Sequence, residues 1–216
     1  MVNLTKIYTR TGDAGRTHLS DMSQADKHDP RVAAYGDVDE ANAVLGIALA
    51  VGLPKEVDEV LRFIQNELFD LGADLSHPLQ QEYQYPPLRI EQECIDRLEA
   101  WCDHFGEPLP NLRSFILPGG TPAAAQLHLA RTVVRRAERS AWIAVHTYGT
   151  DPAADDRPGG VNLLAVKYLN RLSDLLFILV RVINGAEGDI LWVPGGERRP
   201  TDPKGLRQRK RITGEG

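Results

Sequence analysis

Five stretches of apolar residues at helical spacing, each bounded by glycine or proline, fill most of the chain from residue 29 onward. Apolar residues that recur every three or four positions form one face of a helix, and that face must be buried. Few segments alternate with the period of two that half-buried strands show, so an extended sheet is not expected. The spacing predicts helices from Pro30 to just before Gly52, from Pro54 to between Gly72 and Ser76, from Ile90 to His104, from Pro122 to just before Gly149, and from Val161 to Asn184.

Local signals mark where these helices begin and end. Asp29-Pro30 and Thr121-Pro122 each join a capping side chain to a proline that needs no intrahelical donor. Gly185 follows the last apolar stripe and can end that helix. Long helices joined by short breaks predict an all-α protein, a five-helix bundle.

The length of 216 residues suits one domain. We expect a single domain over residues 1–197, with a glycine-containing loop over 1–28 and the helical bundle over 29–185. Residues 198–216 hold seven basic and two acidic residues without apolar periodicity, which predicts a mobile basic tail. For this tail a solvated terminus is favoured over an arm that binds nucleic acid.

Composition and missing motifs exclude several classes of function. The net charge of −5 argues against general nucleic-acid binding. Leu175–Val180, the longest aliphatic or aromatic run, is too short to cross a membrane, and the N-terminus lacks a secretory signal, so we expect a cytoplasmic protein. Cys94 and Cys102, eight residues apart on one helix, are too distant for a disulfide. Glu-x-x-His, His-Glu-x-x-His and Gly-x-Ser-x-Gly are all absent.

The first segment that could carry chemistry is the run from Thr9 to Thr17, which places glycines, hydroxyls and arginines before the first helix. Gly12 and Gly15 permit unusual backbone angles, so such a loop can turn amides and hydroxyls toward phosphate oxygens. Lys27 could add a positive charge to the same place. Taken alone, this pattern more often indicates an ordinary surface turn.

The second segment is an arginine row on the fourth helix, where Arg131, Arg135, Arg136 and Arg139 fall within nine residues. Their charges repel one another, and the single neighbouring acid, Glu138, cannot balance them. A solvated basic face is the commoner explanation of such a row. Small apolar residues between the arginines favour close helix packing instead, and a triphosphate suits several guanidinium groups.

Polar residues on the fifth and first helices leave two alternatives open. Asn170 and Asp174 lie one turn apart beside an apolar stripe, and Asp39 lies within an apolar-patterned helix. Such groups either hydrogen-bond inside the bundle or contact a ligand, and Asp39 would suit an arginine partner.

Together these segments resemble the PduO-type ATP:cob(I)alamin adenosyltransferases. The resemblance covers about Lys6 to Asn184 and rests on five stretches in the family's order, although Arg16–Met22 departs from its more usual run of threonines and glycines. The matching stretches are Lys6–Gly15, Asp29–Arg31 with Tyr35–Glu40, Phe115–Thr121, Arg131–Arg139 and Tyr168–Phe177.

The resemblance implies a five-helix bundle assembled as a homotrimer, with ATP and cobalamin bound near subunit interfaces. It implies that Arg131 pairs with Asp39 across subunits, and that Phe115 helps to hold cobalamin without its lower axial ligand. Arg131, Arg135, Phe115 and Asp39 are thus the expected catalytic set. The implied ATP-binding residues are Thr9, Arg10, Thr11, Gly12, Thr17, His18, Lys27, Arg135, Arg136, Glu138, Arg139 and Asn170.

The implied reaction transfers the 5′-deoxyadenosyl group of ATP to cob(I)alamin and releases triphosphate. Cobalt(I) is itself the nucleophile, so no side-chain base is needed. Mg²⁺ would be held mainly by the ATP phosphates, with no certain protein ligands, and K⁺ is a further candidate cation. A cob(II)alamin reductase and a cobalamin-dependent enzyme are the expected partners, with no nucleic acid or membrane. The alternative is a non-catalytic carrier that loads such an enzyme with cobalamin or nucleotide.

Overall fold

A computed structural model describes residue 8 and residues 10–185 and 188–195. Within these ranges the chain forms the five expected helices and one small hairpin. Thr9 and the basic tail over 198–216 lie outside the described residues. The elements are β1 (Arg16–His18), β2 (Gln24–Asp26), α1 (Pro30–Val51), α2 (Lys55–Ser76), α3 (Gln92–Gly106), α4 (Pro122–Tyr148) and α5 (Leu163–Asn184).

The helix boundaries follow the capping side chains. The Asp29 carboxylate accepts from the Arg31 amide, and the Thr121 hydroxyl accepts from the Ala124 amide, as the sequence predicts. α5 begins two residues later than predicted because Asn162 is the cap, its side chain accepting from the Leu164 amide.

The second and third helices also begin slightly later than predicted. Pro54 occupies the N-cap position of α2 without a capping hydrogen bond, and the helix starts at Lys55. α3 starts at Gln92 because the Ile90 carbonyl, which a longer helix would pair with the Cys94 amide, instead accepts from the Asn162 side chain at 2.9 Å.

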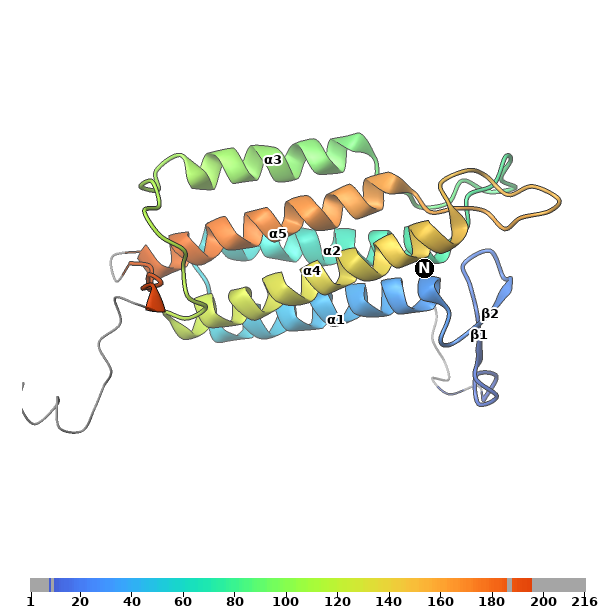
Figure 1. Cartoon of the computed structure of the whole chain (residues 1–216), viewed down its shortest axis with the longest axis horizontal. Helices are drawn as coiled ribbons and strands as arrows, with labels where there is room; N and C mark the ends of the chain where they lie inside the picture. The colour runs from blue at the N-terminus through green and yellow to red at the C-terminus, as the bar shows by residue number, and fades with distance from the viewer. Residues whose placement is uncertain (1–7, 9, 186–187, 196–216) are drawn as a thin grey trace, which may run out of the picture.

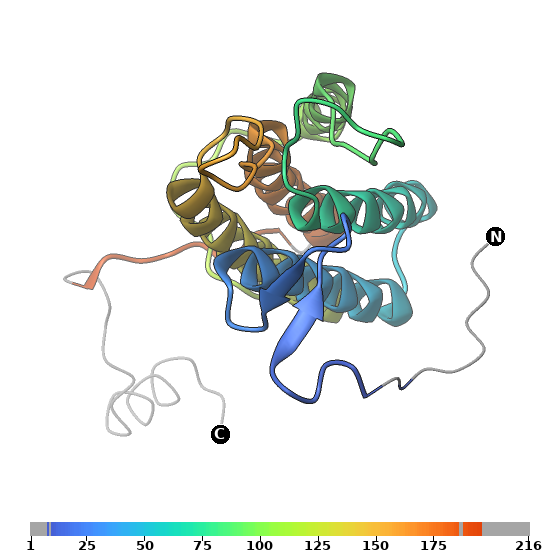
Figure 2. The same cartoon turned by 90° about the vertical axis from the view of Figure 1, so that its right-hand side faces the viewer.

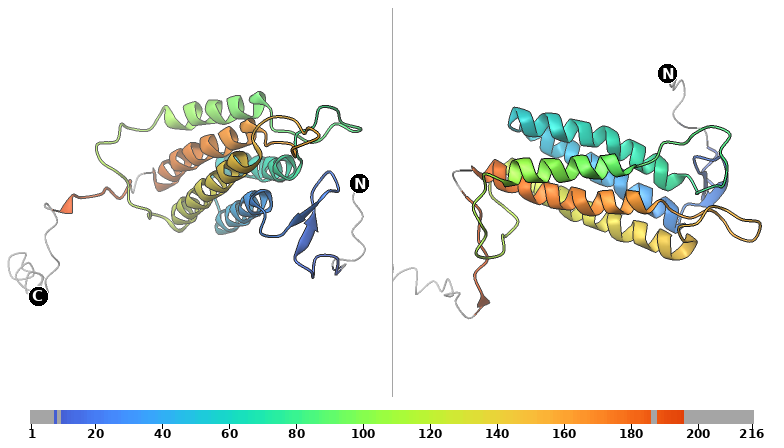
Figure 3. Two further views of the ribbon diagram at one scale, coloured as in Figure 1. Left: turned by 45° about the vertical axis from the view of Figure 1, so that its right-hand side comes forward. Right: turned by 90° about the horizontal axis from the view of Figure 1, so that it is seen from above.

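Four helices form the bundle, and α3 lies against it as a fifth (Figure 1). α4 packs between α1 and α5, α2 packs on α1, and α3 packs on the outer side of α5 (Figure 3). β1 and β2 pair antiparallel, with Thr17 opposite Ala25, and the hairpin lies across the end of the bundle where α1 begins (Figure 2).

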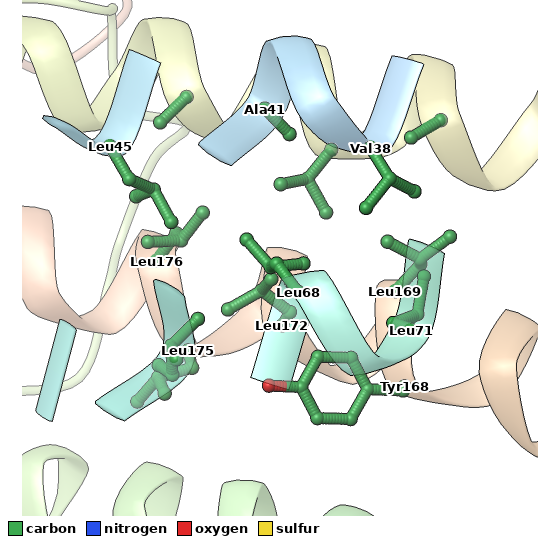
Figure 4. Packing of buried hydrophobic residues seen from close by; sticks show 14 of the residues in the cluster. Val38, Ala41, Leu45, Leu68, Leu71, Tyr168, Leu169, Leu172, Leu175 and Leu176 are labelled. Atoms are coloured by element: carbon green, nitrogen blue, oxygen red, sulfur yellow. The ribbon is translucent and has the colours of Figure 1, made fainter. Parts of the chain in front are cut away.

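The core is aliphatic and continuous along the bundle. Leu45 of α1, Leu68 of α2 and Leu176 of α5 point into it, and each is at most 1% exposed (Figure 4). The buried Tyr168 hydroxyl donates to Glu67 at 2.8 Å, and Arg97 donates to the other oxygen of that carboxylate at 2.6 Å. This polar group therefore joins α2, α3 and α5 inside the apolar packing.

Arg31 fixes the end of the bundle beside the hairpin. It is 2% exposed and donates to the carbonyls of Leu75, at 3.0 Å, and Gly159, at 2.8 Å. The Tyr148 ring lies 4.8 Å from its guanidinium, and the Tyr148 hydroxyl donates to Asp29. The start of α1 and the end of α4 are therefore joined at this end.

The described residues also bear on two further expectations. Cys94 and Cys102 are both free thiols, as predicted. None of the helices in the described ranges combines the length and apolar character that crossing a membrane requires.

Candidate functional site

The glycine-containing loop forms a compact turn against Lys27. The Gly15 amide donates to the Gly12 carbonyl at 3.2 Å, and the Lys27 amide donates to the Gly15 carbonyl at 2.8 Å. Gly15 has φ +81°, which favours glycine. A Cβ on Gly12 would lie 3.0 Å from Lys27 Nζ, so the ammonium group lies directly over the turn. The loop and Lys27 are thus brought together, with Arg10 and Thr11 exposed beside them.

Thr17 and His18 already have partners within the chain. The Thr17 side chain hydrogen-bonds Tyr35, while burial is the main cause of the raised pKa of that tyrosine. His18 Nε2 lies 3.3 Å from Gln24 Nε2 across the hairpin. A contact of either residue with phosphate would have to form beside these interactions.

The arginine row divides into one neutralised group and three that are not. Arg136 pairs with Glu40 and lies 3.5 Å from Asp37, so α1 compensates its charge. Among the described residues no acidic group lies within ion-pair distance of Arg131, Arg135 or Arg139, the other three arginines of the row.

The surroundings of Arg131 are unfavourable for its positive charge. Burial first, and repulsion from Arg135 second, lower the pKa of Arg131, and its Nε is buried without a hydrogen-bond partner. Arg135 and Arg139 are exposed. A bound polyanion would supply the compensation that the described residues do not provide.

Glu138 and Asn170 meet on the outer side of α4 and α5. Asn170 Nδ2 donates to Glu138 Oε1 at 3.2 Å, at a groove of about 410 Å³ that Trp142 and residues of α3 also line. Asp174, by contrast, accepts from Arg171 at 3.0 Å. Both Asn170 and Asp174 are exposed, so neither is a hydrogen-bonding group buried inside the bundle.

Asp39 lies on a different face of the molecule. With Asn42 it lines a cavity of about 390 Å³ between α1 and α2, beside Phe69, which is 71% exposed. Within the described part of the chain Asp39 makes no ion pair, with Arg131 or any other group. An acid and an arginine without partners therefore occupy separate faces of one chain.

Phe115 lines the largest of these cavities, at the opposite end of the bundle from the hairpin. Its side chain is 78% exposed and lines a cavity of about 810 Å³ together with Phe177 of α5 and Trp192. Phe177 and Trp192 have no role in the sequence-based prediction. Phe177 shares its spacing with core residues of α5, and Trp192 stands in a short apolar run, Ile190–Val193, that helical periodicity cannot single out.

The loop and the cavity are separated by the length of α4. The α4 N-terminus contacts the end of α5, where Asn184 accepts from the Thr121 amide, and its last residue contacts Asp29. A helix of 27 residues is about 40 Å long. Arg135 precedes Tyr148 by 13 residues, about 20 Å along the axis. One chain thus does not bring the glycine loop, the arginine row and Phe115 together.

The described residues thus form a five-helix bundle with an arginine row that its own acidic groups compensate only in part, and with a large cavity lined by aromatic side chains. Comparison with known proteins identifies the chain further. The family model described as cobalamin adenosyltransferase matches residues 7–183, and the chain belongs to this family.

Relatives and solved structures agree with that assignment. The corrinoid adenosyltransferase of Mycobacterium tuberculosis is 61% identical over 198 residues, which cover 91% of this chain and 97% of the relative. That of Mycobacterium leprae is 57% identical, covering 90% and 99%. A PduO-type ATP:corrinoid adenosyltransferase from Lactobacillus reuteri, a phenylalanine-to-alanine variant complexed with cobalamin and ATP, superimposes with a TM-score of 0.76 at 35% identity, covering 88% of this chain and all of that one.

Proposed function

We propose that this chain transfers the 5′-deoxyadenosyl group of ATP to cob(I)alamin, at a site built from two subunits. One observation carries the proposal: Arg131 and Arg135 lack acidic partners among the described residues, on the same helix whose start adjoins the Phe115 cavity. The family assignment and the relatives' complexes with cobalamin and ATP support it.

The geometry favours a site shared between chains. The cobalt–carbon bond forms at C5′ as the C5′–O bond breaks, and the bonding electron pair leaves with the triphosphate. The C5′ carbon must therefore meet cobalt while the phosphates meet the cationic groups. With the glycine loop about 40 Å from the Phe115 end of α4, the loop that serves one cavity has to come from a neighbouring subunit.

The separate positions of Asp39 and Arg131 indicate how the subunits associate. When two different patches of the same chain pair with each other, the contact is head-to-tail, and it forms a ring when the rotation between subunits closes. We propose that Asp39 of one subunit pairs with Arg131 of the next, and that the ring is a homotrimer. The exposed Phe69 beside Asp39 supplies apolar area to this interface.

The triphosphate would be held by the residues that the resemblance implies. Arg135, Arg139 and Lys27, with loop amides and Mg²⁺, would stabilise the charge that develops on the leaving group. Arg136, whose charge is compensated by acidic residues of α1, would fix the orientation of the arginine row. Glu138 and Asn170 would bind the nucleoside. Mg²⁺ would be held mainly by the ATP phosphates.

Phe115 would act before the transfer. Its exposed ring can exclude water and the lower axial ligand from cobalt, and cob(II)alamin without axial ligands is more easily reduced. The electrons would come from a separate reductase. We place the reaction in the cytoplasm, where ATP is available, and propose that a cobalamin-dependent enzyme receives the product.

An anaerobic assay with ATP and chemically reduced cobalamin tests the proposal. New absorbance of the Co–C bond with release of one triphosphate per turnover is the expected result. A carrier without catalytic activity would bind both molecules and give neither signal, and that outcome would overturn the proposal.

A further inference from the structure

The cavity at Phe115 is lined by two segments that are far apart in the sequence. The loop before α4 and the segment after α5 pair through their backbones: the Trp192 amide donates to Phe115, and the Leu117 amide donates to Ile190, both at 2.7 Å. The Ser114 hydroxyl donates to the Trp192 carbonyl at 2.7 Å. The rings of Phe115 and Trp192 meet edge to face, with centroids 6.1 Å apart. These two segments are the walls of the cavity.

Arg181 of α5 reaches both walls at once. Its Nε donates to Asp189 Oδ2 at 2.9 Å, just before the second wall, and its Nη2 donates to the Pro110 carbonyl at 2.6 Å, just before the first. Arg181 lies one helical turn beyond Phe177, which lines the cavity between the walls. Because a guanidinium group offers its donors in a rigid fork, one side chain can hold both segments at a fixed separation.

The ion pair of Arg181 and Asp189 is shielded from solvent. The Arg181 and Asp189 side chains are 11% and 14% exposed, whereas the equally short pair of Arg157 and Asp151 is 51% and 64% exposed. Asp189 Oδ1 is buried without a hydrogen-bond partner, so Arg181 provides the compensation for this carboxylate. A shielded pair keeps its strength in salt and holds its geometry better than an exposed one.

We propose that Arg181 and Asp189 are positioning residues for the corrin site. Neither is among the residues lining the cavity; they set the separation of its two walls, and with it the place from which Phe115 excludes the lower axial ligand. The inference rests on the proposed function, because it takes this cavity to be the place where the corrin binds.

Steady-state kinetics of the full-length variants Asp189→Asn and Arg181→Lys test the assignment. Asp189→Asn keeps the shape and removes the charge, while Arg181→Lys keeps the charge and removes the fork. We expect each to raise the KM for cobalamin about ten-fold, the effect of losing one charged hydrogen bond, and to leave the KM for ATP within about two-fold. The EPR spectrum of cob(II)alamin bound with ATP should show a smaller fraction lacking the lower axial ligand.

Arg157→Lys, in the exposed pair, is the matched control and should leave both constants and the spectrum unchanged. If Arg181→Lys fails to fold by circular dichroism, Asp189→Asn alone decides. A folded Asp189→Asn with unchanged cobalamin KM and EPR spectrum overturns the inference, as does an equal rise in both KM values. Failure of the proposed function would look different, because the unmodified protein itself would then give no corrin-dependent turnover.

Discussion

The proposed pairing of Asp39 with Arg131 across subunits leads to a charge-reversal experiment. In a single chain Arg131 is partly buried, its Nε has no partner, and burial and Arg135 lower its pKa. Losing its acidic partner should cost more than the ~0.2–1 kcal/mol of an exposed pair and less than the ~3–5 kcal/mol of a buried one. About 1–3 kcal/mol at each of three interfaces corresponds to about 10²- to 10⁶-fold in the dissociation constant of the trimer.

Asp39→Arg and Arg131→Asp should therefore each dissociate into smaller species, and the double variant should restore the trimer. Sedimentation velocity at micromolar protein measures this. Asp156→Arg, which reverses an exposed charge with no assigned role, is the control and should remain trimeric. The reasoning is refuted if the single variants sediment like the unmodified protein, or if the double variant is no better than either single one.

Three further outcomes are expected. Arg135→Ala should lower kcat about 10²- to 10³-fold in the anaerobic assay and leave the melting temperature within about 2 °C, because this exposed side chain has no ion-pair partner among the described residues; near-normal turnover would contradict its role. Phe115→Ala should slow turnover from cob(II)alamin far more than from pre-reduced cob(I)alamin, and equal losses would contradict the assigned step. Burial and Asp29 raise the pKa of Tyr148 to about 12, above the ordinary value of 10.0, so the stability it contributes is complete below pH 10 and is lost as the pH rises to about 12. Measured by urea unfolding between pH 10 and 12, the free energy of unfolding should fall less steeply with pH in Tyr148→Phe than in the unmodified protein. An equal fall in both proteins would show that Tyr148 does not cause the loss of stability.

The five helices could be predicted because each carries its own signals. Asp29 and Thr121 cap helices within their own first turn, and the apolar stripes repeat over four or more turns. The hairpin was not predicted because strands of three residues are too short to show alternation. Ile90 shows a further limit: its apolar side chain fits the helical stripe, but its carbonyl accepts from Asn162, which is distant in sequence.

The candidate site could be predicted in part, for a similar reason. Residue type and spacing single out the arginine row, but they do not show that α1 neutralises Arg136 and leaves Arg135 without a partner. Phe177 and Trp192 line the same cavity as Phe115 although they are far from it in sequence, and nothing in their local pattern marks them.

The length of α4 has a consequence for mixtures of defective chains. In the proposed ring, each site takes its loop from one subunit and its arginine row from another. A chain damaged only at Lys27 and a chain damaged only at Arg135 would then each spoil every site in a ring of their own kind. In a mixed ring, some junctions bring an intact loop to an intact arginine row. Co-expression of two inactive versions should therefore recover a fraction of the activity, whereas a defect confined to the core of the fold would show no such rescue.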